Sequence, residues 1–349
     1  MMVLPKTKAK LENVNPPPEL EANYRRLYKA EEFFLESVGM TDRSQRFNVG
    51  IDLRGTKQFI RTLLIEPEEP SDTTPDLVLI HGFGGSWTIQ YLLFPYLTKE
   101  FRVWCIDLLG MAGSSRPKFD AKTPEDGLAF FVDSIEAWRQ KIGLQKFYLA
   151  GHSLGGYISG HYAMKFPKYI IKLILISPGG VAQKDPISGK SKNSGLKSKV
   201  NAWLRNWVWN KRWTPAEFYK LCGFIKDSLL KLYVKVRSED DEAVQQALFD
   251  YFKEVLSLPM SSEKCLFYMF GAPGYYGLVP LGKTIVSNPP AFPIDFYYGD
   301  NDRMSSAGAK IVCENPKIKA KLFIIANSGH QISMENPKQL AQLMILNKI

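Results

Sequence analysis

The sequence has few cysteines and few histidines, and it has no long apolar run. Its four cysteines, Cys105, Cys222, Cys265 and Cys313, form no Cys-x-x-Cys pair, and we recognise no secretory signal pattern before them. These features favour a reducing compartment and argue against structural disulfides or a metal site. No apolar run approaches the roughly 20 residues of a membrane-spanning helix. We therefore expect neither a metal nor another cofactor, and a protein that is soluble or bound peripherally to a membrane.

Acidic residues are scarce in one segment, and that segment accounts for the charge of the chain. The net charge is +10, and between Lys184 and Arg237 ten lysines and three arginines face only three carboxylates. A basic segment can be a solvated face, or it can bind phosphate-rich partners such as anionic lipids or nucleic acid. Charge alone leaves these alternatives open.

Apolar strands alternate with amphipathic helices in two parts of the chain, which predicts an α/β fold with a mostly parallel, doubly wound sheet. Between residues 179 and 288 the alternation stops, and the sequence becomes helical in character, basic and aromatic. An inserted helical cap explains this interruption. We predict an N-terminal arm and amphipathic helix over 1–45, a first core part over 46–180, the cap over 181–288 and a second core part over 289–349. The expected strands are 57–65, 76–80, 101–106, 146–150, 170–176, 292–298 and 321–326.

The N-terminal part combines a lysine- and proline-rich arm with one helix. Lys6, Lys8 and Lys10 leave a mitochondrial transit peptide open, although residues 1–18 contain no arginine or serine and include Glu12. Over 19–38 apolar residues recur at helical spacing. We expect this helix to pack on the domain, with membrane contact as the alternative.

The segment YLAGHSLGGY (148–157) contains one serine between two glycines. A strand that reverses sharply into a helix leaves no room for side chains two residues before and after the turn, which fits Gly151 and Gly155 around Ser153. The pattern is that of a Gly-x-Ser-x-Gly nucleophile elbow. Ser153 is therefore the predicted nucleophile.

A serine nucleophile needs a base, and the chain has only four histidines. His81 and His152 lie in glycine-rich turns, and His161 lies within the helix that follows the serine. His330 follows the last predicted strand, so it can face the serine across the carboxyl edge of the sheet. We predict His330 as the general base.

The base needs a carboxylate that orients it, and Asp302 follows the strand before the one that precedes His330. We prefer Asp302 to Asp300, and the order Ser, Asp, His is the one expected on this scaffold. Backbone N–H groups of Phe83, in the turn HGFGG (81–85), and of Leu154 are the predicted oxyanion donors. Each residue taken alone could serve as a cap or turn residue. The combination favours catalysis.

The chain also resembles a subfamily of α/β-hydrolases that act on lipids. The group includes the lysophospholipase of N-acyl phosphatidylethanolamines, the mitochondrial cardiolipin deacylase and the coactivator of adipose triglyceride lipase. The resemblance covers about residues 50–346. It is carried by HGFGG (81–85), DLLG (107–110), SSRPKF (114–119), SIEAWR (134–139), the serine turn, LILISPGG (173–180), WNKRWTP (209–215) and YGDND (298–302). It implies an α/β-hydrolase fold and lipid substrates.

Two departures from the subfamily pattern affect the expected activity. The His-x4-Asp motif linked to acyl transfer is here HQISME (330–335), with Glu335 in place of Asp, and the turn after Asp107 reads GMAG (110–113) rather than Gly-x-Gly. Unlike the coactivator type, which lacks the serine, this chain keeps Ser153.

The predicted cap contains a second lipid signal. Leu196, Val200, Leu204 and Val208 recur at helical spacing together with Trp203 and Trp207, whereas Lys199 and Arg205 fall elsewhere on the helix. Tryptophan and basic residues on an amphipathic helix suit a lipid headgroup interface. We predict Lys199, Trp203, Arg205 and Trp207 as lipid-facing residues; a helix buried on the core of the cap is the alternative.

Together these patterns predict a serine esterase of the phospholipase or lysophospholipase type. We expect it to cleave fatty acyl esters of phospholipids or lysophospholipids at an anionic membrane or lipid-droplet surface. Two alternatives are a lysophosphatidic acid acyltransferase and a non-catalytic adaptor that activates a partner lipase. No nucleic-acid partner is expected. The expected location is cytoplasmic and peripheral to a membrane or lipid droplet, with the mitochondrion as an alternative.

Overall fold

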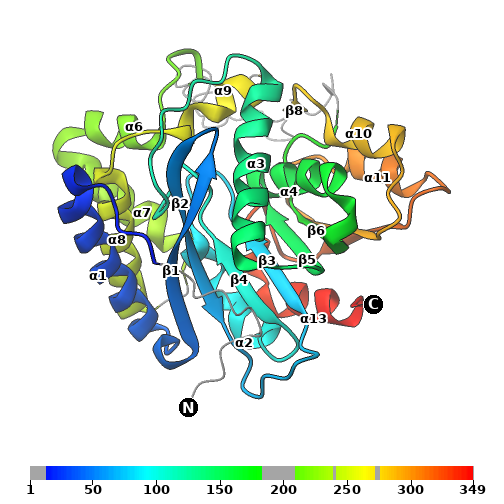
Figure 1. Ribbon diagram of the computed structural model, residues 1–349, viewed down its shortest axis with the longest axis horizontal. Coiled ribbons are helices and arrows are strands. Elements are labelled where there is room, and N and C mark those ends of the chain that lie inside the picture. The colour runs from blue at the N-terminus through cyan, green and yellow to red at the C-terminus, as the bar shows by residue number, and fades with distance from the viewer. Residues whose placement is uncertain (1–12, 183–208, 239–240, 272–275, 349) are drawn as a thin grey trace.

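The computed structural model describes residues 13–182, 209–238, 241–271 and 276–348, and its centre is an eight-stranded sheet (Figure 1). The strand order is β1-β2-β4-β3-β5-β6-β9-β10. The six strands from β4 to β10 run parallel, whereas β2 is antiparallel to both β1 and β4. The strands are β1 Ser44–Leu53, β2 Thr56–Ile65, β3 Asp76–Ile80, β4 Arg102–Ile106, β5 Phe147–His152, β6 Ile170–Ile176, β9 Ile294–Gly299 and β10 Ala320–Ile325. The predicted α/β-hydrolase fold class is confirmed.

Helices cover both faces of the sheet, because the central strands are apolar on both sides. Along β3, Val78 and Ile80 belong to one hydrophobic core, while Leu77 and Leu79 belong to the other. The first core lies under α3 (Pro124–Ile142), α4 (Leu154–Lys165) and α11 (Ala307–Cys313). The second lies under η3 (Trp87–Leu93), α2 (Phe94–Leu97), α12 (Ile332–Glu335) and α13 (Pro337–Leu346).

Strand β1 was not among the predicted strands, although its signal was present. Phe47, Val49, Ile51 and Leu53 alternate with more polar residues, and the next two residues are Arg54 and Gly55. Both adopt positive φ, 53° and 78°. This is the backbone of a tight type I′ hairpin turn, which joins β1 to β2.

Helix α1 (Glu21–Ser37) packs on the domain, in agreement with the preferred expectation for this segment. Tyr24, Leu27 and Phe34 are fully buried, and α1 lies along α8 (Glu242–Ser257), as Figure 1 shows. The Arg26 side chain reaches across to Glu254 at 3.0 Å. Helix α1 is therefore attached to the inserted segment.

The described parts of the insertion between β6 and β9 are mainly helical. They comprise α6 (Pro215–Leu221), α7 (Lys226–Lys235), α8, α9 (Leu266–Met269) and α10 (Leu281–Ser287). A short antiparallel pair, β7 (Phe270–Gly271) and β8 (Tyr276–Gly277), was not predicted. The remaining short turns of 3-10 helix are η1 Pro18–Leu20, η2 Thr41–Arg43, η4 Pro167–Tyr169, η5 Gly223–Ile225 and η6 Ser262–Cys265. In the described ranges, every helix is too short or too polar to cross a bilayer.

Candidate active site

Ser153 lies in the sharp turn between β5 and α4, in a backbone conformation that L-residues rarely adopt. Its φ is +54° and its ψ is −114°. A Cβ atom added to Gly151 would lie 2.4 Å from the carbonyl oxygen of Gly155, and one added to Gly155 would lie 2.3 Å from that of His81. The two glycines therefore permit the turn, which stores strain at the serine.

The structure brings the three predicted triad residues together from the loops that follow β5, β9 and β10. His330 Nε2 lies 3.0 Å from Ser153 Oγ, and His330 Nδ1 lies 3.1 Å from Asp302 Oδ1. Asp302 Oδ1 also accepts the Met304 N–H at 2.9 Å. The carboxylate can receive the Nδ1–H, which leaves Nε2 free to accept the serine proton. The catalytic roles themselves remain a prediction.

Burial sets the charge states in this chain of hydrogen bonds. It lowers the pKa of His330, and the positive charges of Arg303 and Arg237 act in the same direction, while Asp302 opposes them. Burial, the largest single cause, would raise the pKa of Asp302, but the contacts with His330 and the hydrogen bond from the Met304 N–H act together with smaller contributions to lower it. The geometry therefore pairs a neutral imidazole with an ionised carboxylate near neutral pH.

Asp300, the alternative acid, has a different position. Its carboxylate accepts the backbone N–H groups of Asn327 and Ser328, each at 3.0 Å. It thereby ties the loop after β9 to the loop that carries His330. The structure places Asp302, and not Asp300, beside the imidazole.

Two further residues hold the His330 loop, and the sequence did not reveal these contacts. His152 lies within hydrogen-bond reach of the His330 carbonyl through Nε2, at 2.8 Å. Burial, the largest cause, lowers the pKa of His152 to about 3, so its ring is neutral and can donate this bond. On the other side, the carboxylate of Glu335 accepts the N–H of Gly329. The only signal in the sequence was that His152 is next to Ser153. The contact itself joins His152 to His330, which lie far apart in the sequence.

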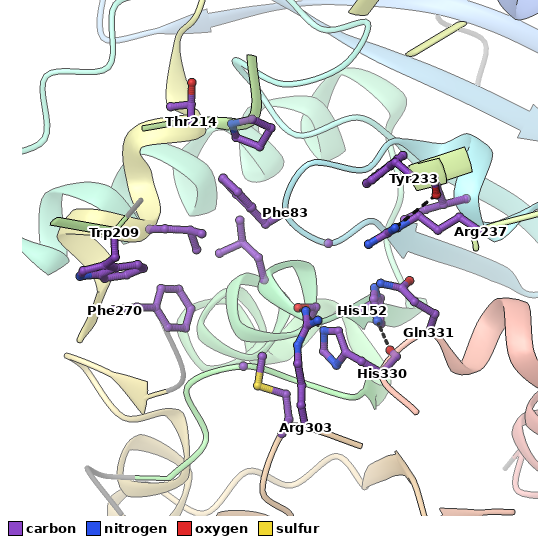
Figure 2. Close-up of a pocket in the computed structure, with 18 of the residues that line it drawn as sticks. Phe83, His152, Trp209, Thr214, Tyr233, Arg237, Phe270, Arg303, His330 and Gln331 are labelled. Atoms are coloured by element: carbon purple, nitrogen blue, oxygen red, sulfur yellow. Dashed lines mark hydrogen bonds between the residues drawn. The ribbon is translucent and has the colours of Figure 1, made fainter. Parts of the chain in front are cut away.

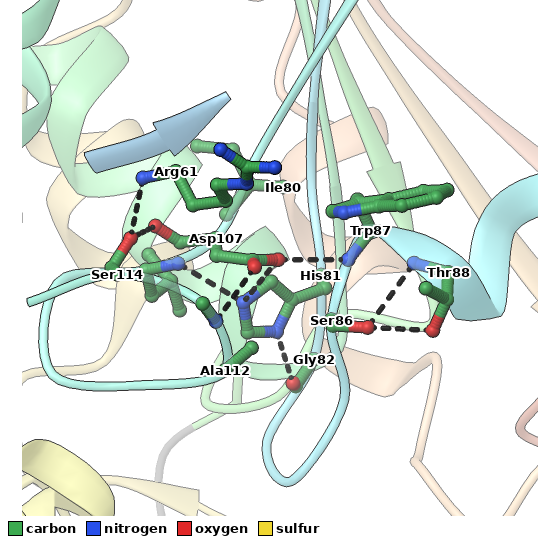
Figure 3. Close-up of polar contacts among 12 residues, drawn as sticks. Arg61, Ile80, His81, Gly82, Ser86, Trp87, Thr88, Asp107, Ala112 and Ser114 are labelled. Carbon is green, nitrogen blue, oxygen red and sulfur yellow. Dashed lines mark hydrogen bonds and ion pairs between the residues drawn. The ribbon is translucent and has the colours of Figure 1, made fainter. Parts of the chain in front are cut away.

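The loop after β3, which carries the predicted oxyanion donor Phe83, is fixed by buried polar contacts (Figure 3). His81 Nδ1 lies 2.7 Å from the Gly82 carbonyl, so it can donate, and His81 Nε2 accepts the Leu108 N–H at 3.0 Å. Asp107 accepts the N–H groups of Trp87 and Gly113, each at 2.9 Å. The loops after β3 and β4 thus hold each other in place.

The turn after Asp107 has Ala112 where the subfamily pattern has its second glycine, yet the backbone there adopts a positive φ, as glycine readily does. Gly110 has a φ of 82°, and Ala112 also adopts a positive φ, 45°. Alanine therefore takes the strained position.

On the other side of the site, a Cβ added to Gly82 would lie 3.0 Å from the Ser153 Cβ, so the loop after β3 approaches the predicted nucleophile closely.

Ser153, His330, Phe83 and Leu154 line a cavity of about 540 Å³. Trp209 and Phe270 stand on one side of it, and Arg237, Gln331 and His330 stand on the other (Figure 2). Described residues from the insertion add further aromatic lining, namely Trp213, Phe218 and Phe267. Of the described lining residues, none is an aspartate or a glutamate.

The predicted lipid-facing residues Lys199, Trp203, Arg205 and Trp207 lie outside the described residues. Their role stays a prediction.

Comparison with known proteins identifies one matching family and several sequence relatives. Residues 75–337 match the family model described as "alpha/beta hydrolase fold". The chain is 30% identical to a protein of Oryza sativa subsp. japonica named "Probable 1-acylglycerol-3-phosphate O-acyltransferase", over 87% of the chain and 76% of that protein. It is 31% identical to the 1-acylglycerol-3-phosphate O-acyltransferase of Arabidopsis thaliana, over 78% of the chain and 65% of that protein. It is 28% identical to "1-acylglycerol-3-phosphate O-acyltransferase ABHD5" of Mus musculus, over 87% and 84%.

Solved structures share the fold at low sequence identity. The naproxen esterase of Bacillus subtilis superposes with a TM-score of 0.64 at 17% identity, covering 94% of this chain and 99% of that one. A membrane phospholipase A described as a bacterial virulence factor gives a TM-score of 0.62 at 20% identity, covering 93% and 91%. At these identities the similarity establishes the fold alone.

Proposed function

The chain belongs to the α/β-hydrolase family, in the subfamily of abhydrolase-domain lipid hydrolases and acyltransferases, and we propose that it is a serine esterase of lipids. It removes a fatty acyl chain from a phospholipid or lysophospholipid. The observation that carries this proposal is the hydrogen-bonded series Asp302, His330 and Ser153 at an aromatic-lined cavity.

The chemistry runs in two steps. Ser153 Oγ attacks the ester carbonyl while His330 Nε2 takes its proton, and Asp302 stabilises the resulting imidazolium. The N–H groups of Phe83 and Leu154 bind the oxyanion, and the leaving alcohol receives the proton from His330. A water molecule, deprotonated by His330, then attacks the acyl-enzyme and releases the fatty acid and Ser153.

The shape and charge of the cavity support a lipid with an anionic headgroup. Aromatic side chains such as Trp209 and Phe270 offer an apolar site for an acyl chain, whereas Arg237 and Arg303 place positive charge near His330. Arginine suits phosphate oxygens because its donors match their geometry. The names of the rice and Arabidopsis relatives refer to an acylated glycerol phosphate, which agrees with this assignment.

Acyl transfer to lysophosphatidic acid is the second candidate, and the names of the relatives favour it. In this reaction the hydroxyl of the acceptor lipid replaces water. Glu335, the acid of the segment HQISME (330–335), adds no independent support for acyl transfer. Its carboxylate accepts the N–H of Gly329, which is a contact within the loop. The third candidate is an adaptor without catalysis that binds a lipase at an anionic membrane or lipid-droplet surface.

A fluorophosphonate probe tests the nucleophile. Wild-type protein should be labelled, whereas Ser153→Ala should not and His330→Gln should be labelled far more slowly. Ser257→Ala, which changes an exposed serine on α8, is the control and should behave as wild type. Equal labelling of Ser153→Ala and wild type would remove Ser153 from the proposed role.

Product analysis then separates the three candidates. With lysophosphatidic acid alone, a hydrolase releases fatty acid, and Ser153→Ala should lower kcat by about 10⁴-fold or more. Phosphatidic acid formed only when acyl-CoA is added would favour the transferase. Cellular function that survives in Ser153→Ala would favour the adaptor.

A further inference from the structure

The largest group of exposed apolar side chains in the described structure lies between the last residue of α6 and the residue that follows α7. Six of the twelve large hydrophobic residues that are exposed occur between positions 221 and 236. Phe224 is 99% exposed, and Leu232 and Val236 are each 60% exposed. Soluble proteins rarely expose such a group without a binding purpose. The members are Leu221, Phe224, Ile225, Leu229, Leu232 and Val236.

Four of these residues form one line along the helix. Ile225, Leu229, Leu232 and Val236 follow the spacing i, i+4, i+7 and i+11, which places them on a single face. Leu230 and Val234, on the opposite face, are buried against the protein. Helix α7 therefore has two apolar faces, one packed and one open. We call the open face, with Leu221 and Phe224 at its start, the α7 stripe.

One edge of the α7 stripe leads directly to the active-site cavity. Tyr233, next to Leu232 in sequence, donates a hydrogen bond to the Gly84 carbonyl at 2.9 Å and lines the cavity. Arg237, next to Val236, also lines it (Figure 2). A surface that contacts the stripe would thus lie next to residues that line the cavity.

The other edge of the stripe is basic. Lys231 and Lys235 are exposed there, and Lys220 and Lys226 lie near the start of the helix. Between residues 218 and 238 the only acid is Asp227, which accepts a hydrogen bond from Tyr219 at 2.6 Å and lies 3.6 Å from Lys253. The charge of this face is therefore positive.

We propose that the α7 stripe is a docking surface that inserts into an anionic lipid monolayer, with Phe224 and Leu232 among the inserted residues and Lys231 and Lys235 at the headgroups. Charge complementarity selects this occupant, because an apolar line bordered by lysines matches acyl chains below a layer of phosphates. Docking brings Tyr233 and Arg237, which line the cavity, close to the lipid surface. It does not depend on Ser153, so it stands independently of the proposed hydrolysis.

Vesicle binding tests this proposal. The parent protein is Ser153→Ala, which leaves the lipids intact, and the probes are vesicles of phosphatidylcholine alone or mixed with phosphatidic acid. We expect stronger binding to the mixed vesicles. Phe224→Ser and Leu232→Ser should each weaken that binding about tenfold, because each removes one inserted apolar side chain.

A matched variant on α11 serves as the control, since α11 lies on the other side of the molecule from α7 (Figure 1). Ile311 is 62% exposed, close to the value for Leu232, so Ile311→Ser removes a similar exposed apolar side chain. It should leave vesicle binding unchanged. Equal losses in Leu232→Ser and Ile311→Ser would overturn the proposal.

A charge test uses pairs of lysines with the same change in net charge. Lys231→Gln with Lys235→Gln should weaken binding to the mixed vesicles more than tenfold at low salt, since each lysine near such a surface contributes about fivefold. Lys310→Gln with Lys317→Gln is the control and should have little effect. The difference between the two pairs should shrink as salt is added.

Other occupants of the stripe give other results. A second copy of the chain would produce a concentration-dependent dimer that Leu232→Ser abolishes, measured by light scattering. A segment of the same chain packed on the stripe would make Leu232→Ser lower the Tm while vesicle binding stays equal to that of Ile311→Ser. Either result would overturn lipid docking.

Discussion

Two aspartates separated by one residue make different contacts in the loop after β9. Asp302 faces His330 Nδ1 at 3.1 Å, whereas Asp300 accepts two backbone N–H groups of the neighbouring loop. We predict that Asp302→Asn lowers kcat by about 10³–10⁴-fold, because an amide leaves the imidazolium without its charge partner. The measurement is steady-state hydrolysis of a soluble short-chain ester.

Asp300→Asn is the matched control for that prediction. It keeps an acceptor oxygen for the loop, so we expect a lower Tm with a change in kcat of less than about tenfold. A similar loss of kcat in both variants would mean that the carboxylate of Asp302 has no special role.

The residues of the candidate site were predictable where chain position alone restricts them. Ser153, Asp302 and His330 each follow a strand that ends at the same edge of the sheet. Each of the three loops contains few other residues that could take the same role. The contact between His152 and the His330 carbonyl was not predictable, because it depends on how two loops far apart in sequence meet. The same holds for the amide that Glu335 binds.

At the level of elements, helix α1 is joined to the sheet by one buried carboxylate. Glu31, which is 1% exposed, accepts hydrogen bonds from Trp87 Nε1 at 2.9 Å and from the guanidinium of Arg61 on β2. Arg61 also donates to Asn48 Oδ1 on β1 at 3.1 Å. Two strands, the loop after β3 and α1 therefore share a single polar cluster.

Loss of that carboxylate should be costly. Glu31→Ala leaves the Arg61 charge buried without its partner, and we expect the free energy of unfolding to fall by about 3–5 kcal/mol. Urea denaturation measures the change.

The neighbouring residue gives the comparison for this measurement. Glu32 is exposed and lies 3.7 Å from Arg46, so Glu32→Ala should cost less than about 1 kcal/mol. If the two substitutions cost the same, the buried cluster does not stabilise the attachment of α1.

The element boundaries show which signals in the sequence were sufficient. Strand β6 begins and ends where predicted, over 170–176, because this segment is apolar apart from Lys172 and is followed directly by Ser177 and Pro178. The apolar segment 87–97 is harder to assign from sequence, because it forms a 3-10 helix, Trp87–Leu93, followed by one short α-helix that has Pro95 in its first turn. Its nearly complete burial erased the amphipathic pattern, so periodicity could not distinguish the two kinds of helix.

For the whole molecule, buried histidines couple stability to pH. Burial, the main cause in each case, lowers the pKa of His81 to about 4, that of His152 to about 3 and that of His161 to about 4. In the unfolded chain a histidine binds its proton near pH 6.5, to within about one unit. As the pH falls from there toward 4, the unfolded state gains protons that the folded state cannot, and stability is lost.

Asp107 acts in the opposite direction over the same range, because burial raises its pKa to about 7 and the folded state keeps that proton. Burial also raises the pKa of Asp76, but it lowers the pKa of His330 as well, so four histidines oppose two carboxyls. We therefore predict that the Tm falls between about pH 6.5 and about pH 4.5, where each unit of pH costs at most ~1.4 kcal/mol per histidine.

His161 allows that coupling to be measured away from the candidate triad. Its Nε2 lies 3.2 Å from the Val279 carbonyl, and His161→Gln keeps a donor there without a titratable group. The Tm of this variant should depend less on pH than that of the wild type. Identical pH dependence in the two proteins would assign the coupling elsewhere.

The place of the insertion also determines when the sheet can be completed. Strand β6 pairs with β9, and in this pairing Ile176 lies beside Tyr297, so the whole insertion must be synthesised first. At about 5–20 residues per second, ribosomes need on the order of ten seconds for that stretch. During this interval the edge of β6 is open to wrong partners. Because Asp302 and His330 come later still, Ser153 cannot meet both of them until residue 330 has left the ribosome.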